Sequence, residues 1–114
     1  MLEELNYFQK DNHQIILGDA LIALTTAIPD SSIDLIFADP PYNIGKNFHG
    51  RKDKWDTDKD YLDWCYQWLG RCIQKLKSNG SFYVMASTQA MPYFDIYLLE
   101  QLNILSRIVW YYDS

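Results

Sequence analysis

The chain has 114 residues, of which 48% are hydrophobic and 22% are charged. This length suits one small domain, and this composition excludes an intrinsically disordered chain. The formal net charge of -5 argues against a protein that is basic over its whole surface, but it permits a local basic patch for nucleic acid. The start of the chain lacks an apolar signal core and no apolar stretch is long enough to span a bilayer. We therefore expect a cytoplasmic protein without membrane contact.

Strands and helices are predicted to alternate along the chain. Residues 14–17 form a short apolar strand, after which Gly18 frees the backbone and Asp19 caps a helix over residues 20–27. Residues 33–38 are almost continuously apolar, which is typical of a parallel strand that is covered on both faces.

The next helix has the clearest pattern. Thr57 and Asp60 resemble a capping box at its start, and residues 78–80 are expected to end it. Its apolar positions recur at steps of three and four, as one wide stripe along Tyr61, Trp64, Cys65, Trp68, Leu69, Cys72, Ile73 and Leu76.

Three further elements complete the alternation. A strand over residues 82–86 is followed by a helix from Pro92 to about residue 102, and a last strand covers residues 107–112. The whole pattern predicts an α/β fold with a parallel-type sheet of about four strands and flanking helices.

The cysteines and histidines do not indicate a metal centre. Cys65 and Cys72 have the spacing of one helical face, which is not that of a CxxC metal or redox motif. We expect both to be small core residues. His13 and His49 are far apart in the sequence, so we expect no metal site.

An apolar strand that ends in Asp39-Pro40-Pro41-Tyr42 lies where open α/β sheets bind ligands. Each proline fixes its own φ and keeps the residue before it out of the helical region, so Asp39 and Pro40 are held extended with free carbonyl oxygens. Tyr42 adds a flat ring. Rigid acceptors beside a stacking surface suit a planar base with an exocyclic amino group, whose two N–H bonds they can orient. The alternative is a stiff loop in which Asp39 is only a turn or cap residue.

This tetrapeptide resembles the DPPY motif of amino-group DNA methyltransferases. The surrounding ILGDAL and IDLIFADPPYNIGKNF are similar to adenine-specific members of the N4/N6 methylase family, in the permuted order called the beta class, and the resemblance continues to SRIVWYYDS. It implies a partial Rossmann-like, class I methyltransferase fold, S-adenosyl-L-methionine as cofactor and double-stranded DNA with a flipped base as partner. The aspartate points to the N6 of adenine, since members acting on the N4 of cytosine usually carry serine there.

The resemblance also implies roles for single residues. Asp39 and the Pro40 carbonyl would accept from the adenine amine, Pro41 would shape the turn, and Tyr42 would stack on the base through its ring. Asp19 matches the acidic motif near the adenine of the cofactor. Its alternative role is a helix cap, and the two roles can coexist.

Basic residues gather in the loop after the tetrapeptide. Lys46, Arg51 and Lys52 are the DNA-binding candidates, because they are placed to contact phosphates. His49, Lys54, Phe48 and Trp55 share this loop. The alternative is a solvated loop, since its charge is diluted by Asp53, Asp56 and Asp58.

The family's phenylalanine- and glycine-rich cofactor loop has no counterpart here, since no two glycines are separated by a single residue. Residues 1–114 are therefore expected to be the N-terminal catalytic part of a methyltransferase domain, without the cofactor loop and the target-recognition region. A second chain or segment would supply them. In the family's sheet order two strands of that absent part lie between the 14–17 and 33–38 strands, which leaves a gap or forces those two strands to pair.

Two other functions are compatible with these residues. The chain is then either an inactive, truncated remnant that binds DNA or a partner, or a methylase for another conjugated amine: the N4 of cytosine, an RNA base or a glutamine side chain. The DNA recognition sequence is not encoded in these residues, because the region that reads bases is not among them.

Overall fold

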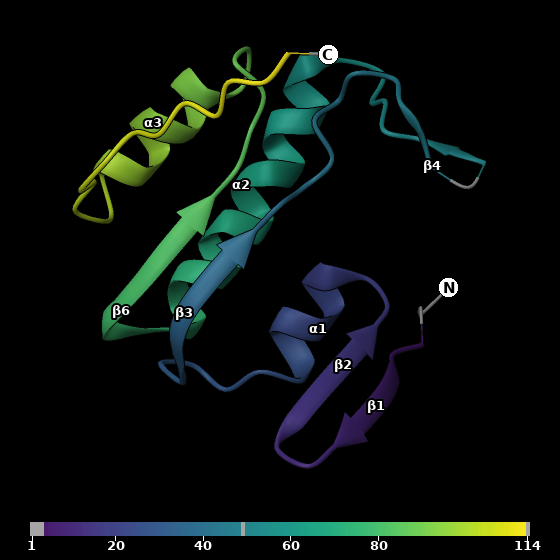
Figure 1. Cartoon of the computed structure of the whole chain (residues 1–114), viewed down its shortest axis with the longest axis vertical. Helices are drawn as coiled ribbons and strands as arrows, with labels where there is room; N and C mark the ends of the chain where they lie inside the picture. The colour runs from purple at the N-terminus through teal and green to yellow at the C-terminus, as the bar shows by residue number, and fades with distance from the viewer. Residues whose placement is uncertain (1–3, 49, 114) are drawn as a thin grey trace.

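The structure is a computed structural model that describes residues 4–48 and 50–113. Its strands are β1 (Asn6–Lys10), β2 (His13–Leu17), β3 (Ile33–Ala38), β4 (Asn47–Phe48), β5 (Arg51–Lys52) and β6 (Leu76–Val84), and its helices are α1 (Ala20–Thr26), α2 (Asp58–Lys75) and α3 (Met91–Leu99). In this mixed α/β arrangement β3 and β6 pair in parallel, whereas β1–β2 and β4–β5 are antiparallel hairpins (Figure 1). No described helix is long and apolar enough to cross a membrane.

The N-terminal hairpin contains a strand that the sequence pattern missed. Asp11 and Asn12 connect β1 to β2, with Lys10 opposite His13, and Asp11 has a φ of 53°. Tight two-residue turns use positive φ values, and Asp and Asn tolerate them better than most residues. β2 and β3 belong to different sheets, so the described chain adopts the arrangement with a gap between these strands.

Helix α2 begins as the sequence predicts and ends earlier. The Thr57 side chain accepts a hydrogen bond from the Asp60 amide at 3.0 Å. The helix ends at Lys75 rather than at residues 78–80, because the amides of residues 31–32 donate to its last two carbonyls at 3.0 and 2.9 Å. With those carbonyls satisfied, the chain passes directly into β6.

The hydrophobic core lies between α2, α3 and one face of the β3–β6 sheet. Its buried residues are Tyr61, Cys65, Trp68, Leu69, Cys72, Ala90, Phe94 and Leu98. Ile36, Ala38, Phe82 and Val84 pack against this core from the sheet. The apolar stripe predicted for α2 is therefore its buried face, and the expectation that both cysteines are core residues is confirmed.

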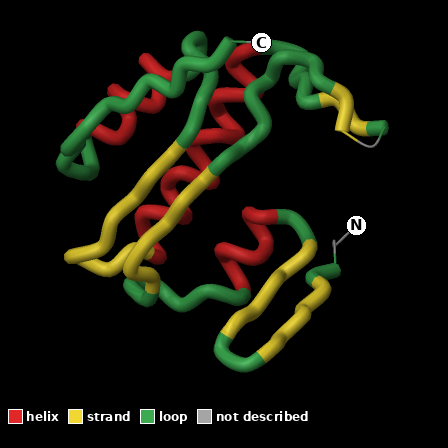
Figure 2. Tube along the Cα trace, in the orientation of Figure 1, coloured by secondary structure: helices red, strands yellow, loops and turns green. Residues whose placement is uncertain are grey.

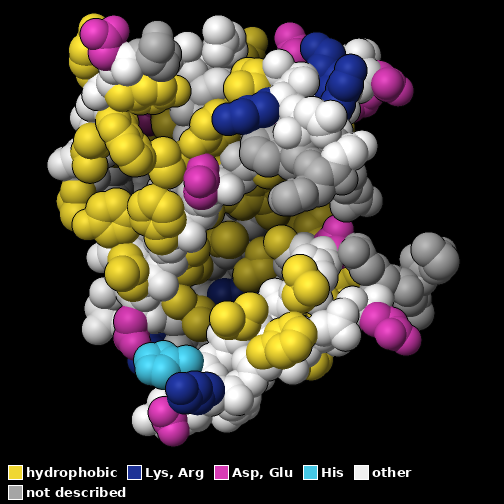
Figure 3. Space-filling view, turned by 45° about the vertical axis from the view of Figure 1, so that its right-hand side comes forward, with side chains coloured by type: hydrophobic (Ala, Val, Ile, Leu, Met, Phe, Trp, Pro, Cys, Tyr) yellow, Lys and Arg dark blue, Asp and Glu magenta, His cyan; other side chains and the backbone are white. Residues whose placement is uncertain are grey.

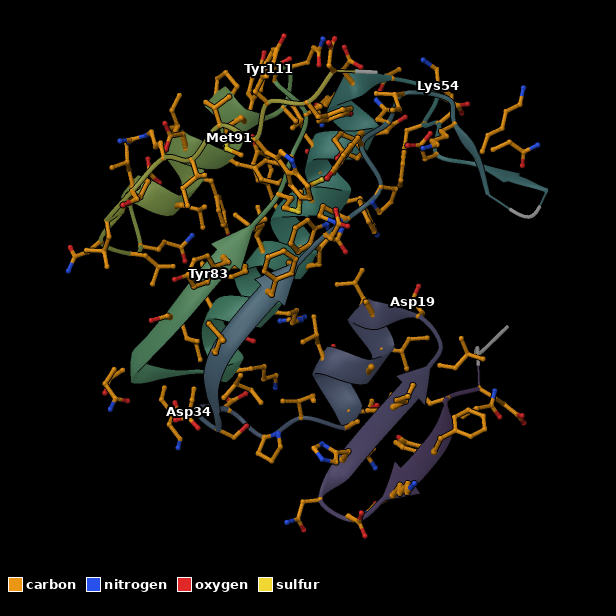
Figure 4. All side chains as sticks on the ribbon, in the orientation of Figure 1. Asp19, Asp34, Lys54, Tyr83, Met91 and Tyr111 are labelled. Carbon is orange, nitrogen blue, oxygen red and sulfur yellow. The ribbon has the colours of Figure 1, made fainter. Side chains whose placement is uncertain are left out.

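The opposite face of the β3–β6 sheet is uncovered in the described chain. Leu35, Phe37 and Tyr83 are 59%, 66% and 51% exposed, and Figure 4 labels Tyr83 on β6. The prediction that the 33–38 strand is covered on both faces is wrong for this chain, because α2 and α3 pack on the same side. Many apolar side chains are also visible on the face of the molecule that Figure 3 shows.

The last predicted strand does not form. Residues 103–113 are neither helix nor strand (Figure 2). No described strand pairs with them, and a strand exists only when a neighbour satisfies its backbone groups. Arg107 is tied to Asp95 of α3 by an ion pair of 2.8 Å, while Leu105 and Val109 on either side of it are 90% and 89% exposed.

The two buried thiols make the fold sensitive to alkali. Burial raises the pKa of Cys65 and that of Cys72 from 9.0 to about 11. The thiols of the unfolded chain therefore ionise first as the pH rises. Their contribution to stability is complete below pH 9 and is lost between about pH 9 and pH 11.

We expect the free energy of unfolding to fall by about 1.5 kcal/mol between pH 7.5 and pH 9.5 through these two thiols. Urea titrations followed by tryptophan fluorescence measure this change. The Cys65→Ala/Cys72→Ala variant starts less stable because it contains cavities, but its stability should fall much less over the same range, since only the tyrosines with raised pKa values still contribute. A fall of equal size in both proteins would contradict the assignment.

Candidate active site

The tetrapeptide lies at the edge of the molecule where three strands end. β2, β3 and β6 point the same way in Figure 1, and their carboxyl ends form the edge at which open α/β sheets bind ligands. Asp39 directly follows β3, whose end is fixed because the Met85 amide donates to the Ala38 carbonyl at 2.9 Å. Asp34 lies at the opposite end of the same strand (Figure 4).

Asp39 and Tyr42 contact each other through their side chains. The Tyr42 hydroxyl donates to Asp39 Oδ1 at 2.8 Å. Burial and this hydrogen bond raise the pKa of Tyr42 to about 12, so that the hydroxyl is a donor at neutral pH. The sequence analysis gave Tyr42 a role through its ring alone. The hydroxyl contact was not foreseen because it depends on the exact course of the turn between the two residues.

The carbonyl oxygens of the two prolines differ in their partners. The Tyr61 hydroxyl, in the first turn of α2, donates to the Pro41 carbonyl at 2.6 Å. The Pro40 carbonyl accepts no hydrogen bond from residues 4–48 or 50–113. The Asp39 carboxylate is exposed. The turn thus presents a carboxylate and one carbonyl as acceptors, while the second proline carbonyl serves to anchor it.

The residues after the tetrapeptide are tied to the start of α2. Asn43 has a φ of 61°, a left-handed conformation that Asn tolerates. Its Oδ1 accepts from the Trp55 amide at 2.9 Å, and its Nδ2 donates to Asp58 at 3.3 Å. The Trp55 ring packs against Tyr61 and Trp64, with ring centroids 4.9 and 5.0 Å away. The turn is therefore connected to the core through aromatic packing.

Asp53 is a part of the site that the sequence analysis misread. It was treated as an acid that dilutes the charge of a solvated loop, yet it is only 6% exposed. Its carboxylate accepts from the Tyr42 amide at 3.2 Å and from the Lys46 amide. No periodicity marks a single acid in a polar loop, so no pattern in one sequence could have identified this contact.

The basic residues form a separate arm. The β4–β5 hairpin projects from the body of the molecule in Figure 1, and Lys54 lies at its base in Figure 4. Lys46 and Lys52 are exposed, and Arg51 belongs to β5. His49 lies outside the described residues. The structure thus brings the three DNA-binding candidates together on one arm that adjoins the tetrapeptide.

Asp19 is the N-cap of α1, as the sequence predicts. Its Oδ1 accepts from the Ile22 amide at 3.1 Å. Its other oxygen has no hydrogen bond within the described chain, so it can accept from a hydroxyl or amino group of a bound molecule. The space beside Gly18 is not open to a ligand, because a Cβ at this position would lie 2.5 Å from the Leu5 side chain. The residues at this strand end therefore fit a cofactor through one carboxylate oxygen.

Metal ligands do not cluster in the part of the chain that is described. No group of three or more His, Cys, Asp or Glu side chains among those residues is placed to hold a metal ion. The acceptors around the tetrapeptide thus have only hydrogen-bond donors as their observed partners.

Comparison with known proteins gives consistent matches. A family profile described as DNA methylase matches residues 33–114. DNA adenine methyltransferase YhdJ of Escherichia coli (strain K12) is 49% identical over 107 residues, which are 94% of this chain and 36% of that protein. Type II methyltransferase M.BamHI of Bacillus amyloliquefaciens is 40% identical over 106 residues, 90% of this chain and 24% of its own.

A third relative covers a similar share. Type II methyltransferase M.HinfI of Haemophilus influenzae is 38% identical over 125 residues, which are 96% of this chain and 33% of that protein. The chain thus spans between 24% and 36% of the length of these curated relatives.

The hydrogen bond between Tyr61 and Pro41 should be measurable by itself. Tyr61→Phe removes a buried donor and leaves the Pro41 carbonyl unpaired, so we expect the free energy of unfolding to fall by about 1 kcal/mol. Tyr66→Phe is the matched control on the same helix, because the Tyr66 hydroxyl makes no hydrogen bond within the described residues. Equal losses in the two variants, measured by urea denaturation, would show that the bond contributes nothing.

Proposed function

We propose a function for a chain that belongs to the DNA methylase family: it is the catalytic part of a DNA methyltransferase that uses S-adenosyl-L-methionine and methylates the N6 amine of adenine. The observation that carries this proposal is the pair of acceptors at the end of β3. The Asp39 carboxylate is exposed, and the Pro40 carbonyl has no partner within the described chain, whereas the Pro41 carbonyl is occupied by Tyr61.

These two acceptors supply what an aromatic amine needs in order to react. The lone pair of such an amine is delocalised into the ring, which makes the nitrogen a poor nucleophile. Asp39 and the Pro40 carbonyl each accept one N–H, orient the nitrogen and favour its pyramidal form as the new bond begins to form. The carboxylate also stabilises the positive charge that develops on the attacking nitrogen.

Tyr42 and Pro41 complete the base-binding surface in this proposal. Pro41 shapes the turn, and the Tyr42 ring stacks on the base once the base has left the duplex, a contact that contributes about 1–3 kcal/mol. Because the Tyr42 hydroxyl already donates to Oδ1 of Asp39, the amine binds to the remaining carboxylate oxygen or displaces that hydroxyl.

The remaining parts of the reaction are assigned to the other candidates. The bound cofactor supplies an electrophilic methyl group on a sulfonium. Asp19 accepts from the adenosyl part through the oxygen that does not cap α1. Lys46, Arg51 and Lys52 contact phosphates of double-stranded DNA from the β4–β5 arm.

Residues 1–114 contain the two acceptors and the β4–β5 arm. A further segment would supply most contacts to the cofactor and would read the DNA sequence. It follows that the 114-residue chain alone should transfer no methyl group to DNA. Activity should appear in a chimera in which this chain replaces the matched segment of the Escherichia coli relative. Tritium transfer from labelled S-adenosyl-L-methionine to unmethylated duplex DNA measures both.

The modified base tests the substrate. Digestion of the product to nucleosides, followed by mass spectrometry, should identify N6-methyladenine. Detection of N4-methylcytosine instead would identify cytosine as the target base and refute the assignment to adenine. Transfer to RNA or to a glutamine peptide but not to DNA would refute the proposal. Transfer by the purified 114-residue chain alone would show that these residues already contain a complete cofactor site.

Asp39→Asn in the chimera should reduce the rate constant of methyl transfer by about 10²–10³ while DNA binding is nearly unchanged. The amide has a similar size, but it lacks the negative charge and can turn its NH₂ towards the amine. Asp34→Asn is the matched control, since Asp34 lies on the same strand at the other end and pairs with Lys77 at 3.0 Å. A normal rate for Asp39→Asn in single-turnover assays would remove this carboxylate from the mechanism.

A further inference from the structure

Only two charged side chains in the described chain are buried, and their partners differ. Lys75 is 6% exposed and its ammonium forms an ion pair with Asp30 at 2.7 Å. Asp53 is equally buried, yet among the described residues its carboxylate is bound by backbone amides and not by a cation. A buried carboxylate is costly unless it is hydrogen-bonded, so the burial of Asp53 in a lysine-rich loop calls for a structural reason.

Asp53 is joined to the catalytic turn by four hydrogen bonds. Oδ2 accepts from the Tyr42 amide at 3.2 Å, and Oδ1 accepts from the Lys46 amide. In the main chain, the Asp53 amide donates to the Lys46 carbonyl at 3.0 Å, and the Gly45 amide donates to the Asp53 carbonyl at 3.2 Å. The two carboxylate oxygens therefore hold both ends of the segment from Tyr42 to Lys46.

The segment between those ends needs such support. Asn43 and Gly45 both have left-handed backbones, with φ values of 61° and 78°. A Cβ at Gly45 would meet no atom within 4 Å, so packing does not restrain the backbone at this residue. Backbone conformations of this kind persist when surrounding contacts over-determine them. The Asn43 side chain supplies some of those contacts, and the Asp53 carboxylate supplies those at the two ends of the segment.

We propose that Asp53 is a positioning residue: its carboxylate holds the Tyr42 and Lys46 amides, aims Tyr42 at the base and couples the β4–β5 arm to the turn. The role in aiming Tyr42 at a base rests on the proposed function. The hydrogen bonds by which Asp53 holds the turn do not depend on that function. Lys52 immediately precedes Asp53 and Lys54 follows it. Phosphate contacts on the arm and base contacts at the turn are then held in one fixed geometry.

The first test uses the 114-residue chain and needs no activity. In Asp53→Asn only one oxygen can accept, and the NH₂ faces the second amide. We expect the Tyr42 and Lys46 amide protons to shift upfield in NMR spectra and to exchange about tenfold faster, which corresponds to one lost hydrogen bond. Amides within α2 should keep their shifts, which establishes that the variant is folded.

Two further variants sharpen this comparison. Asp56→Asn removes the same charge from the same loop, but Asp56 is exposed and has no hydrogen bond within the described residues, so both amides should be unchanged. Asp53→Ser keeps a single small acceptor and avoids the NH₂ group, so it should lie between the native chain and Asp53→Asn. Unchanged Tyr42 and Lys46 signals in a folded Asp53→Asn chain would overturn the proposal.

The second test places the same substitutions in the chimera. In single-turnover assays with a 2-aminopurine-labelled duplex, Asp53→Asn should lower the rate constant of methyl transfer by about 10- to 100-fold, with the dissociation constant for the duplex within twofold of the unaltered protein. Asp56→Asn should leave both constants unchanged. If the NMR signals of the Tyr42 and Lys46 amides change but the rate constant of methyl transfer does not fall, the positioning role is overturned.

The two proposals fail in different ways. An unaltered chimera that methylates no DNA refutes the proposed function, and the NMR comparison then decides by itself whether Asp53 holds the turn. A loss of DNA affinity equal to the loss of rate would show that Asp53 acts on binding as a whole, which overturns a role in aiming Tyr42.

Discussion

The packing of α2 against the β3–β6 sheet and α3 is the constraint on which the candidate site depends. Tyr61 and Trp68 are 2% and 5% exposed, so burial of the stripe fixes both the position and the rotation of the helix. That rotation places the Tyr61 hydroxyl against the Pro41 carbonyl. The turn from Asp39 to Tyr42 is thus positioned by a core residue that lies 20 positions beyond Pro41 in the chain.

The candidate site combines exposed hydrogen-bond acceptors with buried supports. Asp39 is exposed at the surface, and it belongs to a turn whose neighbours are held by Tyr61, Asn43 and Asp53. An exposed loop by itself would fluctuate too much to hold an amine in a reactive geometry. Hydrogen bonds to partners that are packed or buried remove that freedom without covering the acceptors.

One face of the β3–β6 sheet exposes apolar side chains that a complete domain would normally bury. Leu35, Phe37 and Tyr83 expose more than half of their surface. Contiguous apolar surface of this kind normally contacts another element or another chain. Together with the share of about a third or less that the chain covers of its relatives, this face supports the proposal that a further segment completes the domain.

Periodic patterns determined most of the secondary structure. The stripe along α2, the Thr57 and Asp19 caps and the apolar strand before Asp39 could be read directly, because burial imposes a regular spacing on side chains. The extended conformation of the tetrapeptide could also be predicted, because two successive prolines restrict the backbone whatever surrounds them. Residues 107–112 have a strand-like composition but form no strand, because pairing requires a neighbour that the described chain does not offer.

The sequence by itself therefore determined the elements, the buried face of α2 and the acceptors at the end of β3, since each follows from local backbone restriction or from side-chain spacing. Only the tertiary structure decided which carbonyl is free, that the Tyr42 hydroxyl contacts Asp39, and that Asp53 is a buried clamp. These contacts join residues that are 3, 11 and 20 positions apart across irregular turns. No repeat encodes them, because their geometry arises only when the packing of α2 brings the loop and the turn together.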